Sequence, residues 1–239
     1  ARDVTAIAAT HSDFEWQNPI MNSITFQTSL RRSARRERDF ALAGFPTSDL
    51  ASGHGRSVER PSKWTDPPSV GFQGSARRTD LSAERYGRDL ATWLSERIGL
   101  GSAVLERGKW SEGQLLRAES MAALRMEGVA CDFHVATRAY LGATPRKRET
   151  SRRSFIDNLL RNQYALCVRG RGNFSYRFYE AMSLSRLPVF IDTDCVLPFD
   201  HLVDWPSELV WVDRLRVADS AAILRAFHNE HQGTSLPKQ

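Results

Sequence analysis

Short apolar runs alternate with longer amphipathic stretches along the part of the chain beyond residue 68. Apolar runs of strand length, bounded by glycine, proline and polar residues, predict buried strands, and apolar positions spaced three and four apart predict helices. The predicted strands cover residues 69–74, 104–105, 131–135, 164–168, 187–191 and 208–212, and the predicted helices cover 80–98, 111–126, 154–162, 175–185 and 219–228. Strands and helices in alternation predict an α/β protein with a parallel, doubly wound sheet.

The first 68 residues have a different pattern. Residues 20–26 predict one strand, and residues 31–38 are rich in arginine and predict a solvated basic segment. Residues 61–68 contain three prolines and are typical of a stiff linker. The pattern predicts two units, a partial N-terminal domain with its linker over residues 1–68 and a second domain over residues 69–239.

Composition narrows the class of protein only modestly. Of the 33 basic residues only four are lysines, and the planar guanidinium group suits phosphate ligands, although genomic base composition also raises arginine content. The three cysteines have no paired ligand spacing, so no zinc site is predicted, and three unpaired thiols favour a reducing compartment. Because no apolar run reaches membrane-spanning length, we expect no transmembrane helix in this stretch.

The richest candidate chemistry lies between residues 164 and 194. An apolar strand ends at Val168, a loop with Gly170 and Gly172 follows, and a helix begins near Asn173 or Ser175. Free amides at such a helix start, with Arg169 and Arg177 nearby, suit a phosphate. A carboxylate at Glu180 could then accept hydrogen bonds from ribose hydroxyls, and Asp192 and Asp194 follow the next strand. The plainer alternative is a capped loop with Glu180 on a solvated helix face.

The same residues resemble the exostosin glycosyltransferases. The resemblance rests on Arg-Gly-x-Gly-Asn-x-Ser-x-Arg-x-Tyr-Glu at 169–180, Leu-Pro-Val-Phe-Ile-Asp-Thr-Asp at 187–194, Leu-Pro-Phe at 197–199, and Asp204-Trp205. Weaker similarity extends upstream to Phe26, to residues 70–74, and to residues 132–135 with Arg138. The sequence differs from the family pattern at Ser185, where a glycine is common, and in its short ends. We therefore expect the chain to be a fragment.

The resemblance implies a GT-B architecture, in which two Rossmann-like domains face each other. It further implies an inverting transfer of sugar from a nucleotide-sugar, usually a UDP-sugar, to a glycan or lipid-linked acceptor, with no bound metal and no cofactor besides the donor. The donor-binding residues implied by position are Arg138, Arg169, Gly170, Asn173, Ser175, Arg177, Glu180 and Asp194. The implied location is cytoplasmic or peripheral to a membrane, or the Golgi lumen in a eukaryotic protein with an anchor elsewhere.

Several assignments stay open at the level of sequence. The catalytic base is expected to come from the N-terminal segment, where His11, Asp13 and Glu15 are the nearest titratable cluster, but none is assigned. His228 and His231 are expected to be solvated. Residues 145–153 predict a charged loop, which contains a second basic run at 146–153. Two competing hypotheses are a nucleic-acid-binding module that uses the basic runs at 31–38 and 146–153, and a catalytically inactive glycan-binding relative. No nucleic-acid motif accompanies these runs, so we expect no nucleic-acid partner.

Overall fold

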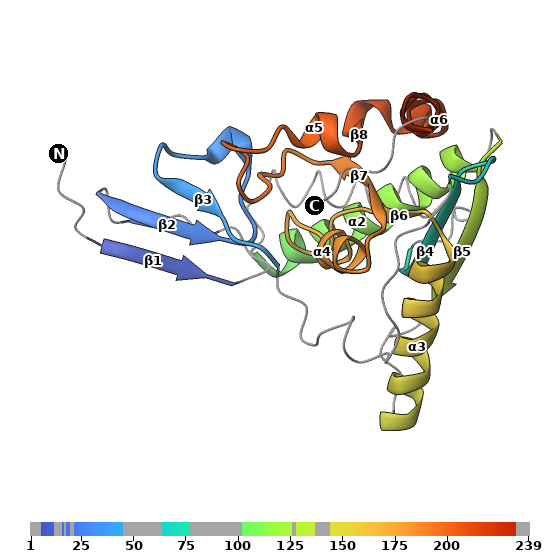
Figure 1. Cartoon of the computed structure of the whole chain (residues 1–239). Coiled ribbons are helices and arrows are strands. Elements are labelled where there is room, and N and C mark those ends of the chain that lie inside the picture. The colour runs from blue at the N-terminus through green and yellow to red at the C-terminus, as the bar shows by residue number, and fades with distance from the viewer. Residues whose placement is uncertain are drawn as a thin grey trace.

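Two parallel β-sheets and the helices around them make up the protein in the computed structural model (Figure 1). The structure describes residues 6–11, 16, 18–19, 22–44, 64–76, 102–125, 128–136 and 144–232. The α/β class and the parallel strands predicted from sequence are confirmed. The division into units at residue 68 stays a prediction, and the helix predicted over 80–98 lies outside the described residues.

The larger sheet has five strands in the order β5-β4-β6-β7-β8, and all neighbouring strands are parallel. The strands are β4 (Ser69–Ser75), β5 (Ala130–Ala136), β6 (Tyr164–Cys167), β7 (Leu187–Asp192) and β8 (Val210–Asp213). Each coincides closely with a predicted apolar run. Because β4 has β5 on one side and β6 on the other, the strand order reverses direction between β4 and β6.

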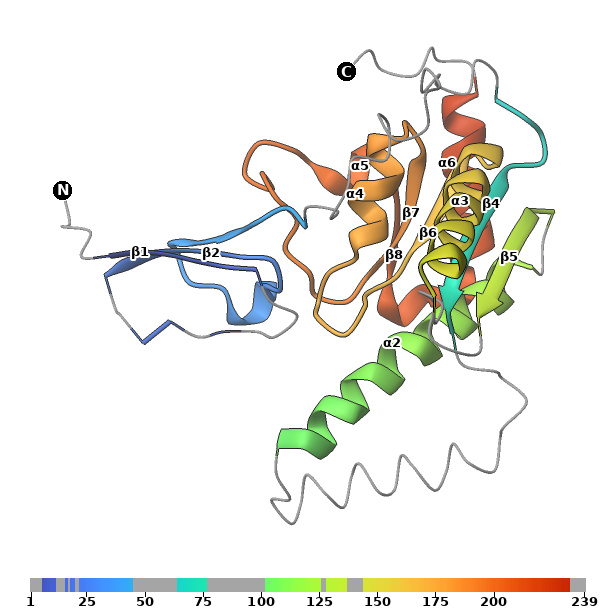
Figure 2. The same ribbon diagram turned by 90° about the horizontal axis from the view of Figure 1, so that it is seen from below.

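The smaller sheet contains β1 (Ala6–Thr10), β2 (Ser23–Gln27) and β3 (Asp39–Ala41), also parallel and in that order. Sequence predicted only β2. The other two are short or partly exposed, so they lack the apolar run that marks a buried strand. Figure 2 shows this sheet beside the carboxyl-terminal part of the molecule, next to the loops that follow β6 and β7.

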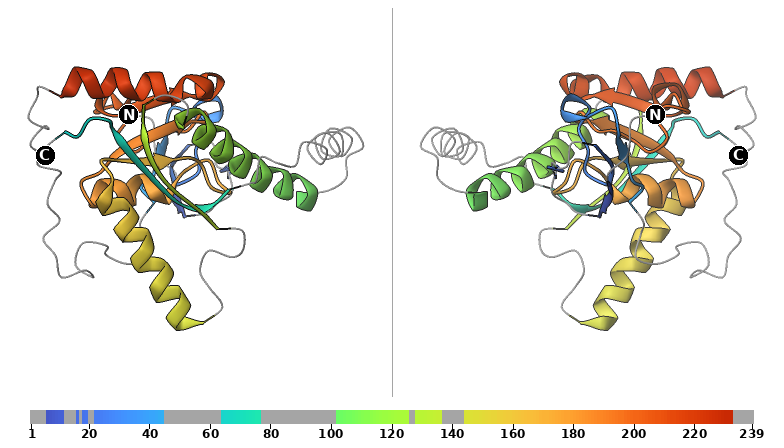
Figure 3. Two further views of the ribbon diagram at one scale, coloured as in Figure 1. Left: turned by 90° about the vertical axis from the view of Figure 1, so that its right-hand side faces the viewer. Right: turned by 90° about the vertical axis from the view of Figure 1, so that its left-hand side faces the viewer.

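Helices cover both faces of the larger sheet, so that α6 and α3 lie on opposite sides of it (Figure 3). The helices are α2 (Ser102–Leu124), α3 (Pro145–Arg161), α4 (Tyr176–Ser183), α5 (Trp205–Glu208) and α6 (Ser220–His231), with short 3-10 helices at Arg32–Ala34 and Arg214–Asp219. None of the helices described combines the length and the apolar character that crossing a bilayer requires.

Alternation along the strands divides the core into two layers. In β7, Val189 and Ile191 belong to the cluster packed against α2 and α6, whereas Phe190 belongs to the cluster with α3 and α4. Both faces of the strand are therefore apolar, which explains why buried parallel strands appear as continuous apolar runs in the sequence.

Two sequence predictions about secondary structure are wrong. Residues 104–105, predicted as a strand, lie inside α2. Residues 145–153, predicted as a charged loop, form the first half of α3, where the Thr144 hydroxyl accepts a hydrogen bond from the Lys147 amide at 3.3 Å. The exposed half of α3 has few apolar residues, so its cap and Pro145 were its only local signals.

His228 is buried rather than solvated, which corrects another expectation. Its side chain is 1% exposed, and its Nδ1 atom lies 3.0 Å from the Tyr164 hydroxyl, beside Trp64. Burial lowers the pKa of His228, against weaker opposing contributions from Asp66 and Thr65. His231 is half-buried and contacts the Phe227 carbonyl at 2.7 Å.

Acidification should destabilise the protein through His228. The unfolded chain takes up a proton near the ordinary pKa of 6.5, whereas the folded protein takes it up only at lower pH. The contribution of neutral His228 to the free energy of unfolding is therefore fully present above about pH 6.5, and it is lost as the pH decreases toward the folded pKa. Measured by urea unfolding between pH 7.5 and 5, the free energy of unfolding should decline less steeply with pH in His228→Gln than in the unaltered protein. His201→Gln, at an exposed position, should retain the original slope.

Candidate functional site

The reversal of strand order places a candidate site at the carboxyl ends of β4 and β6. In open α/β sheets, ligands bind beyond the carboxyl ends of strands at this reversal. Here those ends are Ser75 of β4 and Cys167 of β6, and the glycine loop that precedes α4 begins directly after β6. The fold therefore places the sequence motif at the position where a ligand is expected.

Two arginines reach this position from different helices. Arg117 of α2 donates hydrogen bonds to the carbonyl oxygens of Ser75 and Arg169, both at 2.9 Å, and so bridges the ends of β4 and β6. Arg177 of α4 donates to the Gln73 carbonyl and stacks over Phe72 with 4.2 Å from its central carbon to the ring centroid. A Cβ at position 74 would lie 2.9 Å from this guanidinium, so a larger residue there would displace the end of the Arg177 side chain.

The two guanidinium groups make the site strongly cationic. Burial lowers the pKa of Arg117 to about 10, and the positive charge of Arg177 adds to that shift. Within the described part of the chain, neither guanidinium pairs with a carboxylate, and both Nε atoms are buried without a hydrogen-bond partner. Two neighbouring cations without a carboxylate partner among the described residues favour an anionic ligand.

Glu180 is the acidic residue of α4, and it lies on the same helix as Arg177. Burial raises the pKa of its carboxyl, and the charges of Arg177 and Arg152 oppose that shift. The Glu180 side chain is half-buried, and among the residues described its carboxylate has no hydrogen bond or ion pair. A desolvated carboxylate without a partner is a recurrent property of ligand-binding sites. We refer to Arg117, Arg177 and Glu180 as the switch-point site.

A hollow of about 520 Å³ adjoins the switch-point site through Gln73. It lies between the end of β4 and the first turns of α3, and Arg146, Lys147 and Thr150 are among its lining residues. Because the Gln73 carbonyl accepts a hydrogen bond from Arg177, the hollow and the arginines share one residue. Its size falls within the usual range of ligand pockets, about 300–1,000 Å³.

The glycine loop is more tightly packed than the sequence suggested. The Gly170 amide donates to the Phe174 carbonyl at 2.9 Å, and the Asn173 amide donates to the Ser29 hydroxyl at 2.8 Å. The expectation that the loop offers its amides freely is therefore wrong for these two residues. Ser175 is the N-cap residue of α4, but its side chain makes no capping bond, so the first-turn amides are not capped by it.

Arg169, predicted to contact a diphosphate, points into the protein instead. Its side chain is 2% exposed and lies 3.5 Å from the Glu112 carboxylate of α2. Its backbone carbonyl accepts the bond from Arg117. Gly113 allows α2 to approach this loop, since a Cβ there would lie 2.8 Å from the Gly170 carbonyl oxygen. Arg169 and Gly170 thus support the loop from behind, and Arg177 and Glu180 remain the candidates for ligand contact.

Asn173 and Asp194 connect the loop to the N-terminal segment. The Asn173 side chain is fully buried, donates to the Asp194 carbonyl at 3.1 Å, and accepts from the Thr193 hydroxyl at 2.7 Å. Asp194 has a positive φ of 66° and accepts hydrogen bonds from the Ser33 amide and hydroxyl. These two residues position the loop, and their direct contact with a ligand stays a prediction.

The arginine-rich segment at 31–38 is largely exposed, as predicted, but three of its guanidinium groups are paired with carboxylates. Arg32 pairs with Asp192 and donates to the Cys195 carbonyl at 2.8 Å, and Arg35 pairs with Asp200. Arg36, just before β3, pairs with Asp39 at the start of that strand. The Arg32 and Arg35 guanidinium groups fasten the N-terminal segment to the end of β7 and to the loop after it, because these carry the complementary carboxylates.

Sequence reasoning missed Arg117 and could not place every predicted residue. Arg117 lies in α2 between the buried residues Leu116 and Ala118, and an arginine flanked by buried positions is the only local signal of its role. Arg138 lies outside the described residues, as do Asp13 and Glu15. His11 is described, and its Nε2 atom lies 3.5 Å from the Tyr176 hydroxyl. Within the described ranges, no His, Cys, Asp and Glu side chains form a group able to hold a metal ion.

The fold and the site define an α/β protein with a cationic switch-point site. Over 83 residues the chain is 31% identical to exostosin-1 of Drosophila melanogaster, and over 82 residues it is 28% identical to exostosin-1a of Danio rerio. These alignments cover 35% and 34% of this chain but only 11% of each exostosin, so the chain matches about a tenth of their length. No protein-family model matches. The chain is thus exostosin-like over about a third of its length.

Proposed function

We propose that the protein is a glycosyltransferase that binds a UDP-sugar at the switch-point site and transfers the sugar to a glycan or lipid-linked saccharide. The observation that carries the proposal is the arrangement of Arg117, Arg177 and Glu180 at the reversal of strand order. Two cations without carboxylate partners suit a diphosphate, and a carboxylate one turn further along α4 suits the vicinal hydroxyls of a ribose. The similarity to exostosins supports the same class of enzyme.

In this proposal the protein stabilises the departing diphosphate with guanidinium groups and the start of α4, and no metal is required. Negative charge develops on the diphosphate as its bond to the sugar breaks, and preorganised cations stabilise that charge in the transition state. Displacement from the opposite face of the sugar would invert its anomeric centre. The base that accepts the acceptor's proton is not assigned, and peripheral association with a membrane is part of the proposal because lipid-linked acceptors reside there.

The hollow beside Gln73 is the proposed place for the remainder of the donor. It opens next to the residue that Arg177 contacts, and Arg146 and Lys147 add positive charge along α3. A UDP-sugar carries two phosphates, so the additional cations contribute to the same electrostatic attraction. Arg138, on the segment between β5 and α3, belongs to this proposal as a further phosphate contact.

Titration with UDP tests the proposal directly. Arg177→Ala should weaken UDP binding about tenfold, because one charge-assisted hydrogen bond is lost while the Gln73 carbonyl already occupies part of the guanidinium. The matched control is Arg216→Ala, an exposed arginine paired with Asp219 away from the site, which should leave UDP affinity unchanged. Calorimetry gives both values. Equal affinity in the two variants would refute the assignment of the diphosphate to Arg177.

Transfer assays separate an active enzyme from a binding protein of the same fold. With a UDP-sugar and a glycan acceptor, an active enzyme releases UDP in proportion to the glycoside formed, and the product has the opposite anomeric configuration to the donor. A protein that binds UDP but forms no UDP from the UDP-sugar under these conditions would keep the proposed donor recognition and contradict the proposed catalysis.

A further inference from the structure

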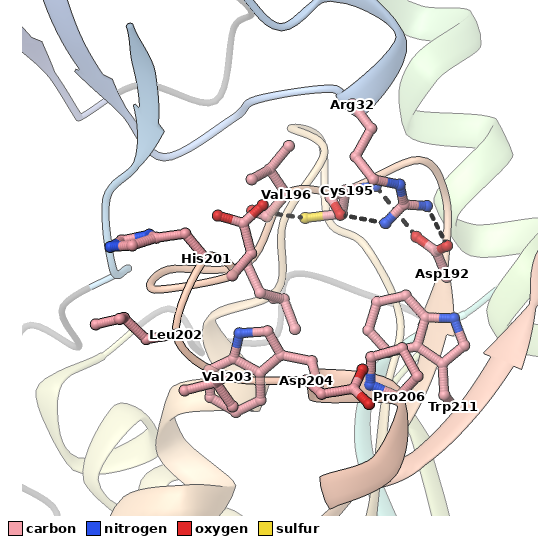
Figure 4. A pocket seen from close by; sticks show the side chains of 13 residues that line it. Arg32, Asp192, Cys195, Val196, His201, Leu202, Val203, Asp204, Pro206 and Trp211 are labelled. Carbon is pink, nitrogen blue, oxygen red and sulfur yellow. Dashed lines mark hydrogen bonds and ion pairs between the residues drawn. The ribbon is translucent and has the colours of Figure 1, made fainter. Parts of the chain in front are cut away.

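A second cavity lies on the other side of α4, away from Gln73. It has a volume of about 620 Å³ and lies between the Arg32 segment, the loop after β7, and β8. Its lining includes Arg32, Asp192, Asp200, Asp204, Trp205 and Trp211. In Figure 4, Arg32 and Asp192 lie together above the Trp211 ring, and Asp204 and Pro206 lie beside that ring. We call it the tryptophan cavity, and none of its residues belongs to the switch-point site.

The two tryptophans are held rigidly by the protein around them. The Trp205 indole N–H donates to the Pro198 carbonyl at 2.9 Å, and its ring packs edge-on against Phe178 of α4. Trp211 packs against Phe190, with 4.9 Å between ring centroids. Both rings remain partly exposed where they line the cavity. Fixed aromatic surfaces bind amphipathic ligands at little entropic cost, because their conformation does not change on binding.

The charged groups of the cavity are mostly balanced by one another. Arg32 pairs with Asp192 and lies over the Trp211 ring at 5.8 Å, and Arg35 pairs with Asp200. Asp204 is the exception: in the described part of the chain its carboxylate makes no side-chain hydrogen bond or ion pair, and it does not cap α5. The cavity therefore combines aromatic walls, hydrogen-bonding groups, and one carboxylate that is not neutralised.

From this arrangement we propose that the tryptophan cavity binds a neutral pyranose ring of the acceptor glycan, an inference that rests on the proposed function. A pyranose has an apolar face of C–H groups that suits an indole, and hydroxyl groups at its edge that donate to carboxylates. The uncompensated charge of Asp204 repels uronate and sulfate groups, which excludes acidic saccharides. The Asp204 carboxylate accepts a hydrogen bond from a sugar hydroxyl, and the Trp205 and Trp211 rings contact the C–H face of the pyranose.

Binding of defined oligosaccharides tests the inference without any transfer reaction. The probes are neutral cello-, chito- and malto-oligosaccharides, with a uronate-containing and a sulfated oligosaccharide for comparison, titrated by calorimetry. We expect one neutral series to bind and the acidic probes not to bind. Asp204→Asn should weaken that binding about tenfold, since a hydrogen bond to a charged acceptor is replaced by one to a neutral acceptor. Asp157→Asn, an exposed carboxylate on α3, is the matched control and should have no effect.

Two further measurements keep the outcomes distinct. Trp211→Phe retains an aromatic ring against Phe190, so it should fold, and its smaller surface should weaken saccharide binding while UDP affinity stays unchanged. Failure of every neutral probe to bind, preferred binding of an acidic probe, or equal affinity in the Asp204 and Asp157 variants would overturn the inference. In each of these cases UDP titration of the same samples still reports separately on the donor site.

Discussion

Glu180→Gln should weaken UDP binding about tenfold to a hundredfold and at the same time make the free protein more stable. The loss of affinity follows because a carboxylate accepts hydrogen bonds from ribose hydroxyls more strongly than a neutral amide does. The gain in stability follows from the raised pKa of Glu180, which means that folding disfavours the charged form of this carboxyl. Calorimetry with UDP and thermal unfolding at neutral pH measure the two effects.

The pH dependence of the stability difference identifies its cause. Below about pH 4.5 the carboxyl is protonated in the folded and the unfolded chain alike, so the unaltered protein and Glu180→Gln should converge. As the pH rises above 4.5, the unfolded chain ionises first, and the stability of the unaltered protein falls relative to the variant until the folded pKa is passed. A variant advantage that persisted in acid would point to packing rather than charge.

Glu230→Gln is the matched control for this substitution. Glu230 is exposed near the end of α6 and away from the switch-point site, so its replacement should change neither UDP affinity nor stability appreciably. Opposite effects on binding and stability at Glu180, with neither at Glu230, would indicate a residue kept for its ligand at the expense of stability. Unchanged UDP affinity in Glu180→Gln would contradict the proposed ribose contact.

The second large effect is expected at the junction between the glycine loop and the N-terminal segment. Asn173→Ala should lower the free energy of unfolding by about 2–4 kcal/mol, because it removes a fully buried amide and leaves the buried Thr193 hydroxyl without its acceptor. The Asp194 carbonyl loses one of two donors and keeps the hydrogen bond from the Arg32 amide. Urea denaturation with a comparison of slopes measures the change. Asn229→Ala, at an exposed position of α6, is the control and should have little effect.

A double-substitution cycle separates the unpaired groups from the loss of packing. Thr193→Val removes the hydroxyl that donates a hydrogen bond to the Asn173 side chain. The double variant should therefore lose less free energy of unfolding than the sum of the losses in the two single variants. UDP affinity should also decline in Asn173→Ala, since the loop that begins α4 would lose its side-chain attachment to the loop after β7. Strict additivity of the two substitutions would show that the hydrogen bond between these side chains contributes little.

Local sequence determined the central part of the larger sheet and the start of the candidate site. The continuous apolar runs at β4, β6, β7 and β8 predict buried strands because both faces of each strand are covered by helices. The glycine loop and Ser175 mark the start of α4 because cap and turn residues act through their own backbone. A parallel α/β arrangement then places the motif at a carboxyl end, and this prediction is confirmed by the strand order.

Only the tertiary structure decided which side chains meet at that end. Arg117 reaches the switch point from a helix whose own pattern gives no sign of a ligand, and Arg169, which the motif favoured, is turned inward toward Glu112. Asn173 pairs across 144 residues with Ser29, and β1 and β3 become strands by pairing with β2. The spacing of apolar residues and the capping of helix ends act over a few residues, so they specify individual helices and strands. Ion pairs and buried hydrogen bonds between distant residues depend on distances that exist only after the chain has folded.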